Sequence, residues 1–203
     1  ISSQAFQSCS KLTSVIFEDA SKLLTIGSSA FASPNLIESI TIPASVTSIG
    51  RDAFNGCSGL TSVILMSGSQ LMTVGWNALF NTGVNQCLIT PDNNGNIIIP
   101  ATMTNIPPIA FYGCSDLKSM TFESGSQLAK INSHAFAHSG VSGSISFPKS
   151  LISIEFAAFA FCSSSFSVSF DSGSQLTSIK NYAFWTSGLS GFISAPLSLV
   201  TVG

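Results

Sequence analysis

The two histidines of the chain, His134 and His138, lie four residues apart in the segment "NSHAFAHSG". On a helix, this spacing would place both imidazoles on one face, where they could bind a metal ion. No cysteine or carboxylate nearby in the sequence completes such a site, and the Ala135-Phe136 pair between them suits a tight bend that buries the ring. We therefore expect two surface histidines and no metal site.

Oxygen-bearing side chains are abundant, but their spacing does not predict catalysis. The segment "DNNGN" at Asp92–Asn96 resembles half of a calcium-binding loop and lacks the second carboxylate that would raise its affinity, so a polar turn is the better interpretation. The many serines would allow a Ser/His/Asp triad arithmetically, yet no Gly-x-Ser-x-Gly elbow is present. The sequence therefore predicts neither an enzyme nor a bound cofactor.

Charged side chains make up only 8% of the 203 residues, against roughly 25% in a typical soluble domain. The net charge of −2 provides no basic footprint for a nucleic acid, and no apolar run approaches the ~18 residues of a membrane-spanning helix. Three carboxylates, Glu18, Glu123 and Asp171, recur just after predicted strands. They are either solvated turn residues near a sheet edge or contacts for a cation or a basic partner.

All of these residues are carried by an internal repeat. The dipeptide Ala-Phe recurs, with one copy changed to Ala78-Leu79, and the copies are 25 or 23 residues apart except for one interval of 32. The sequence therefore contains eight units of alternating length, with one net insertion of nine residues. The marker alanines are Ala5, Ala30, Ala53, Ala78, Ala110, Ala135, Ala158 and Ala183.

Every unit contains the same local signals. A stretch such as "LTSVIL" at Leu60–Leu65 alternates inward and outward side chains, as a short strand does. A turn of one of two lengths follows, either "SGSQL" or a Pro-x-Ser/Thr turn two residues shorter. A second short extended piece then leads to the Ala-Phe segment, which forms a tight bend. Because such a unit cannot bury its own apolar side, the pattern predicts a solenoid of stacked units with little helix.

Two columns of buried side chains should run through this stack. The phenylalanines of the Ala-Phe pairs should form one column, with Leu79 replacing one ring. Cysteines three positions after these rings should form another, and alternate rungs would hold their Cα atoms ~10 Å apart, beyond the ~7 Å that a disulfide spans. We therefore expect free thiols in the column and an exposed Cys87 outside it. The column cysteines are Cys9, Cys57, Cys114 and Cys162.

The segment "IPASVTSIGRDAFNGCSGLTSVIL" resembles the BspA-like, or Treponema-type, leucine-rich repeat, and similar strings recur from Ile1 to Gly203 outside the insertion. The resemblance implies a single right-handed, β-rich leucine-rich-repeat solenoid over residues 1–203, with a parallel sheet on one face. It also implies a surface or secreted protein of mucosal microbes, protists included, that adheres to host cells or matrix.

A solenoid binds partners with its exposed sheet face, so the outward strand positions are candidates for a site. One outward row is nearly all serine. The neighbouring row contains Ile16, Ile64 and Ile98, which together with Met66 could form an apolar patch for a partner. The alternative is that these isoleucines only reflect the β-propensity of the strands.

The insertion at about 85–95, "NQCLITPDNNG", is the second candidate, because insertions in repeat proteins emerge as loops that often carry function. An apolar piece, Cys87–Ile89, precedes a turn signal, and this order predicts a hairpin-like excursion with its tip near Asp92–Asn94. A neutral insertion is the alternative. The candidate partner-binding residues are Ile16, Ile64, Met66, Ile98, Asn85, Cys87, Thr90, Asp92, Asn93 and Asn94.

Through the resemblance we expect an extracellular or cell-surface adhesin segment that binds a host matrix or cell-surface protein. A structural spacer that projects another domain, or an intracellular scaffold, is the alternative. The chain starts and stops at repeat marks without polar caps, so we also expect it to be a fragment of a longer array whose end rungs associate end to end.

Overall fold

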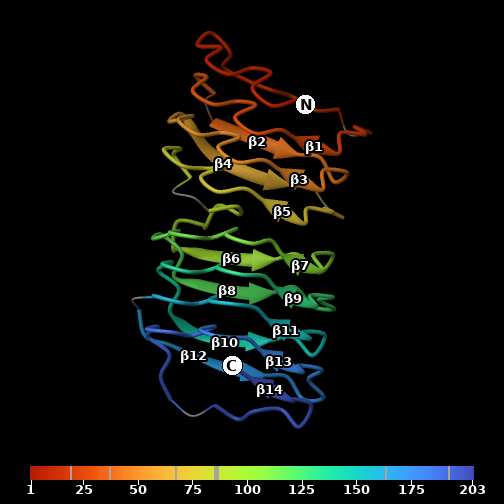
Figure 1. The fold of residues 1–203 in the computed structure, drawn as a ribbon, viewed down its shortest axis with the longest axis vertical. Coiled ribbons are helices and arrows are strands. Elements are labelled where there is room, and N and C mark those ends of the chain that lie inside the picture. Colours follow the sequence, from red (N-terminus) through yellow and green to blue (C-terminus); the bar gives the residue numbers. More distant parts are fainter. Residues whose placement is uncertain (19, 37, 67, 85–86, 163, 192) are drawn as a thin grey trace. The chain divides into compact units, whose positions relative to one another are not determined.

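The computed structural model describes residues 1–18, 20–36, 38–66, 68–84, 87–162, 164–191 and 193–203. Asn85, one of the candidate residues, lies outside them. The chain divides into two compact units, Ile1–Thr90 (unit 1) and Pro91–Gly203 (unit 2), which are described separately. Each unit is a β-solenoid of parallel strands (Figure 1), and the described part of the chain contains no helix, hence none that could cross a bilayer.

Unit 1 contains two sets of parallel strands. Two longer strands pair with each other, and three strands of two residues form a separate sheet. The longer strands are β2 (Glu38–Ile42) and β4 (Leu60–Leu65), and the short ones are β1 (Thr25–Ile26), β3 (Ser48–Ile49) and β5 (Thr73–Val74). The strand expected from the first repeat is absent, because residues 12–18 make no strand pairing and Ile16 is 90% exposed.

Unit 2 repeats this arrangement over more rungs. Its longer strands pair as β6 with β8 and β10 with β12, and its short strands form one sheet in the order β14-β13-β11-β9-β7. The longer strands are β6 (Asn96–Ile99), β8 (Ser119–Phe122), β10 (Gly143–Phe147) and β12 (Phe166–Phe170). The short strands are β7 (Asn105–Ile106), β9 (Lys130–Ile131), β11 (Ser153–Ile154), β13 (Ser178–Ile179) and β14 (Thr201–Val202).

The phenylalanine stack is confirmed within each unit, but its ends are less buried than predicted, because Phe6 is 40% exposed and Phe184 is half-buried. In unit 1, Phe31 is fully buried and stacks on Phe6 and Phe54 with ring centroids 5.2 and 5.4 Å apart. In unit 2, Phe136 is fully buried between Phe111 and Phe159, at 4.8 and 4.9 Å. The fully buried rings of Phe31, Phe54, Phe111, Phe136 and Phe159 supply the apolar contact that an isolated repeat lacks.

The bend around each marker alanine has a backbone that the repeat pattern did not reveal. The residue before the alanine and the residue three positions after it both have positive φ in all eight repeats. Side chains other than glycine are uncommon there, and Asn and Asp tolerate this left-handed region best. The first position holds Gln4, Ser29, Asp52, Asn77, Ile109, His134, Ala157 and Tyr182, and the second holds Ser8, Ser33, Gly56, Asn81, Gly113, His138, Phe161 and Thr186.

This backbone lets six of the bends, at Ala5, Ala30, Ala53, Ala110, Ala135 and Ala158, each donate three hydrogen bonds to the next rung. In unit 2, for example, the N–H groups of His134, Phe136 and His138 donate to the carbonyl oxygens of Phe156, Ala158 and Ala160, at 3.1, 2.7 and 2.9 Å. The tight bends are therefore held across rungs by backbone bonds, as the strands are.

Glycine allows close approach between rungs in unit 1. Gly27, Gly50 and Gly75 directly follow β1, β3 and β5. A Cβ added to Gly50 would lie 2.5 Å from the backbone nitrogen of Ser28, closer than real Cβ atoms come to backbone. The backbones of consecutive rungs are thus in direct contact at this position.

The cysteine column needs two corrections. Cys57 and Cys162 are buried and free as expected, and their Sγ atoms donate to the carbonyl oxygens of Phe31 and Phe136, at 3.0 and 3.2 Å. Cys9 is free but exposed, and Cys114 is disulfide-bonded. Since the other three column cysteines are free, Cys114 is not bonded within the column, and the spacing argument failed because it considered only column partners.

Candidate binding surface

The predicted apolar patch is exposed but divided between the two units. In unit 1, Ile16 and Ile64 are exposed, whereas Met66 is half-buried. Ile98, on β6, is an exposed residue of unit 2. A binding role for these residues stays a prediction.

The insertion is more closely packed than expected. Cys87 is fully buried and disulfide-bonded, so the expectation of an exposed cysteine is wrong. Thr90 lies beside β4, where its Oγ1 accepts a hydrogen bond of 3.2 Å from the N–H of Val63. Because residues 87–95 contain no strand, the apolar stretch does not form the arm of a hairpin but packs inward.

Among the described residues of the insertion, 87–95, the exposed ones are Asp92, Asn93 and Asn94, where the tip was predicted. One oxygen of the Asp92 carboxylate accepts hydrogen bonds from the N–H groups of Asn94 and Asn96, at 2.8 and 2.9 Å. These bonds, with that to Asn96 the largest contribution, lower the pKa of Asp92 below its ordinary value. The acidic side chain therefore closes its own turn, which agrees with the polar-turn interpretation.

The outward sheet face of unit 2 forms a shallow polar groove of about 700 Å³. Its walls are the longer turns at 123–126 and 171–172, and its floor includes Ser144, Ser146 and the shorter turn at Pro148. The alternation of turn lengths thus creates a depression between two longer turns. The serines are engaged with neighbours: Ser144 Oγ lies 3.0 Å from Ser167 Oγ, and Ser146 Oγ donates to Asp171 Oδ1 at 3.1 Å.

The recurring carboxylates behave as turn residues. Glu123 Oε2 accepts a hydrogen bond of 2.8 Å from the N–H of Ala101, in the preceding short turn, and Asp171 accepts the bond from Ser146. Among the described residues, no three His, Cys, Asp or Glu side chains converge as metal ligands would.

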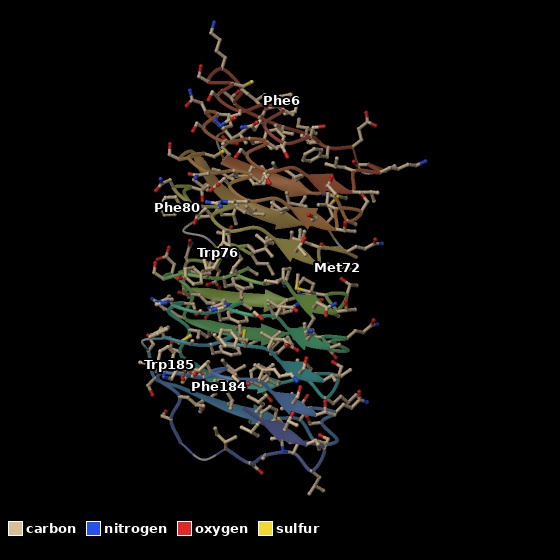
Figure 2. All side chains as sticks on the ribbon, viewed as in Figure 1. Phe6, Met72, Trp76, Phe80, Phe184 and Trp185 are labelled. Carbon is tan, nitrogen blue, oxygen red and sulfur yellow. The ribbon has the colours of Figure 1, made fainter. Side chains whose placement is uncertain are left out.

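A different surface of unit 2, missed by the sequence analysis, gathers seven rings at the bends. We call it the aromatic arc. Neighbouring rings lie in the order Tyr112, His138, Phe161, Trp185, Tyr182, Phe156 and His134, with centroid distances of 5.3, 4.7, 4.8, 5.3, 5.6 and 5.4 Å. Four of these rings are exposed in large part: Phe156 (43%), Phe161 (37%), Tyr182 (53%) and Trp185 (53%). Figure 2 shows Phe184 within the stack of rungs and Trp185 at its margin.

Small buried residues pack beneath the surface of the arc. Ala137, Ala157 and Ala160 form a buried cluster, and Tyr112 packs against it. These alanines occupy bend positions next to the rings, so they bring the ring-bearing backbone of neighbouring rungs together without filling the surface. The arc is therefore a fixed array on hydrogen-bonded backbone.

The two predicted surface histidines belong to this arc. His138 is exposed and stacks on Phe161, whereas His134 is half-buried against Phe156. Desolvation, followed by repulsion from His138, lowers the pKa of His134, which favours its neutral form. The sequence signal that could have found the arc is the aromatic content of the bends in "NSHAFAHSG", "EFAAFAFCS" and "NYAFWTSG".

Comparison with solved structures supports the fold. A leucine-rich repeat protein from Bacteroides ovatus ATCC 8483 is similar to this chain, with 23% identity and a TM-score of 0.51. The match covers 99% of this chain and 71% of the Bacteroides chain. At this identity the likeness shows the fold alone.

Two weaker similarities involve proteins whose descriptions mention the cell surface or immunity. The pneumococcal vaccine antigen PcpA has 20% identity and a TM-score of 0.49, and the match covers 87% of this chain but 57% of that protein's chain. A leucine rich cell surface protein from Faecalibacterium prausnitzii A2-165 has 20% identity and a TM-score of 0.35, with 97% and 70% coverage. No curated protein matches the sequence.

The family assignment rests on the repeats themselves. The profile of the BspA type leucine rich repeat region matches residues 1–95 and 90–202, which together span nearly the whole chain. The repeat phase, the parallel strands and the buried ring column all agree with this match. The chain belongs to the family of BspA-type leucine-rich repeat proteins.

Proposed function

We propose that this chain is an extracellular or cell-surface binding segment, an adhesin that attaches to molecules of a host cell or of its matrix. The aromatic arc is the observation that carries this proposal. Soluble proteins expose single apolar residues routinely, but a contiguous group of exposed rings is typical of an interaction site. Trp and Tyr are also the residues that most often dominate binding energy.

The backbone conformation at the arc residues favours the interpretation that the rings are there for binding. Phe161 and Tyr182 both have positive φ, where a bulky ring is disfavoured relative to Asn or Gly. A sequence selected for bend stability alone would place Asn, Asp, Ser or Gly at these positions, as unit 1 does. Disfavoured conformations of this kind concentrate at functional sites.

The extracellular location is supported by two observations. Cys87 and Cys114 are disulfide-bonded, and disulfides persist mainly in oxidising compartments. The similar Faecalibacterium protein is described as a cell surface protein. The disulfide-bonded cysteines disfavour the intracellular scaffold, and a passive spacer would not need the arc.

The test compares two pairs of exposed rings at matched repeat positions. Phe156 and Trp185 of the arc lie two residues before and two residues after their marker alanines, and Trp76 (50% exposed) and Phe80 (40%) occupy the same positions around Ala78 in unit 1. Binding of the protein to immobilised matrix proteins and cultured epithelial cells should be lost in F156S/W185S and kept in W76S/F80S. Equal binding by both variants, with unchanged melting curves, would reject the arc as the site, and absence of binding by the unsubstituted protein would favour the spacer.

A further inference from the structure

We propose that the aromatic arc binds the carbohydrate part of a host glycoprotein or glycolipid, specifically an uncharged, extended, β-linked oligosaccharide whose sugar rings pack on the arc. This inference rests on the proposed function and names the chemical class of its ligand. Three properties of the surface lead to it: its area, its charge and its spacing.

The area suits a small ligand better than a protein. A half-exposed aromatic side chain presents roughly 100 Å², so the four exposed rings offer about 400 Å². A stable protein–protein interface buries ~800 Å² on each partner. A few sugar rings match the smaller area. Phe156, Tyr182 and Trp185 meet their neighbouring rings in tilted or T-shaped contacts, so no parallel ring among the described residues covers their faces. The partly positive C–H bonds of a pyranose can meet the negative face of such a ring.

The charge of the surface selects a neutral ligand. From two residues before to three residues after each marker alanine, the bends of unit 2 contain no charged side chain. The residues that accompany the rings there include Ser133, Asn181 and Thr186, whose hydroxyl and amide groups can exchange hydrogen bonds with sugar hydroxyls. The bends of unit 1, by contrast, include Arg51 and Asp52, which pair at 3.2 Å.

The spacing of the rings follows the rungs of the solenoid. The His138 and Phe161 rings, on consecutive rungs, are stacked 4.7 Å apart, and Phe161 and Trp185, again on consecutive rungs, are 4.8 Å apart. Neighbouring parallel strands lie ~4.8 Å apart, and an extended β-linked glycan advances along its axis by about one pyranose ring per sugar. Successive sugars can therefore meet successive bends, whereas a helically coiled α-linked chain loses this register after one or two sugars.

The experiment uses Trp185 as the reporter. The chain has two tryptophans, so the W76F variant leaves Trp185 as the only one. Titration of this protein with cellohexaose and chitohexaose should change Trp185 emission with saturation, and maltohexaose or a sulfated heparin hexasaccharide should bind more weakly. Adding F161N, in which Asn suits the left-handed backbone, should weaken the affinity by about tenfold. A W185Y variant, followed by calorimetry, should retain binding, and all variants should keep the parent melting curve.

The outcomes separate the inference from the proposed function. Failure of every neutral hexasaccharide to bind, or equal binding by F161N, overturns the glycan inference. Undiminished, arc-dependent attachment to enzymatically deglycosylated host protein also overturns it, while it upholds the adhesin and shows that the arc docks on protein. If W76F binds the hexasaccharides but the protein attaches to no host cell or matrix, the glycan site stands and the adhesin proposal fails.

Discussion

The bends of unit 1 and unit 2 have the same backbone but very different side chains. At the two positive-φ positions, unit 1 uses small polar residues, Gln4 and Gly. Unit 2 uses two His, one Tyr, one Phe, one Ile, one Ala, one Thr and one Gly. Bends of both units make hydrogen bonds to the next rung, so these bonds do not explain the difference. The residues of unit 1 follow the preference of the left-handed backbone, whereas most of those in unit 2 do not.

The position after the short strands differs between the units in a similar way. Unit 1 places Gly27, Gly50 and Gly75 there, in contact with the preceding rung. In unit 2, Asn132 occupies this position, and its side-chain amide donates to the carbonyl oxygen of Ile106 at 2.9 Å. Glu155, one rung further, pairs with Lys130 at 3.2 Å. Unit 1 brings backbones together with glycine, whereas unit 2 joins its rungs partly through side chains.

The largest expected effect tests what the two units share. Replacing Phe54 in unit 1 or Phe136 in unit 2 with Ala should each destabilise its own unit by about 3–5 kcal/mol, because each substitution removes a fully buried ring and leaves a cavity. Hydrogen exchange would locate the loss, and denaturant titration would measure it. Loss of protection in only one unit for both variants would show that the ring columns are not equivalent.

Thiol reactivity provides a second comparison at matched positions. Burial raises the pKa of Cys57 to about 12 and also raises that of Cys162, so neither should form a thiolate at pH 8. Labelling of the native protein should modify Cys9 alone. Denaturation without reductant should expose three thiols, and reduction should expose all five. Rapid native labelling of one buried cysteine would show that its unit opens more readily.

A third prediction concerns glycine. Gly50→Ala should destabilise unit 1 by about 1–3 kcal/mol, because the new Cβ would overlap backbone atoms of Ser28 that cannot move independently. The matched change in unit 2, Asn132→Ala, should cost about 0.5–1.5 kcal/mol through the lost hydrogen bond to Ile106. Thermal melting of both variants checks the order. An equal or smaller cost for Gly50→Ala would contradict the close approach.

Exchanging Asn and Ile between the two units at the first left-handed position tests whether backbone conformation determines the residue there. Asn77→Ile should cost unit 1 about 1–2 kcal/mol, the penalty for a β-branched residue at positive φ. Ile109→Asn should stabilise unit 2 by a smaller amount, since it also removes apolar contact. Denaturant titration would measure the change in unfolding free energy of each variant. If both substitutions leave it unchanged, the left-handed backbone does not determine which residues unit 1 uses at this position.

The smallest expected effect is a pH dependence confined to unit 2, which contains both histidines. The pKa of His134 is lowered in the folded protein, so its contribution to stability is present above the unfolded value of ~6.5 and is lost as pH falls from there toward the folded pKa. Melting between pH 7.5 and pH 5 should show a small loss that H134N abolishes. A loss of equal size in H134N would assign the effect to other groups.

Much of the fold was predictable because burial is periodic in this sequence. The strands, the two turn lengths and the ring column follow from apolar residues in register, and Gly125 and Gly173 in the "SGSQL" turns have positive φ, which glycine adopts without steric cost. Other features lack a periodic signal. The left-handed positions hold unrelated residue types, and the rings of the arc occupy four different offsets from the marker alanine. The disulfide-bonded state of Cys114 has no periodic signal, because the other column cysteines are free.

The bend hydrogen bonds have an electrostatic consequence. In each of the six bends, the N–H groups of alternate residues face the next rung, and the carbonyl groups of the same peptide units face the previous rung. Three peptide dipoles per bend, of ~3.5 D each, therefore align along the stacking direction, as they do along the axis of an α-helix. A column of such bends has a positive and a negative end, so anions are favoured on the side toward which the N–H groups point and cations on the other.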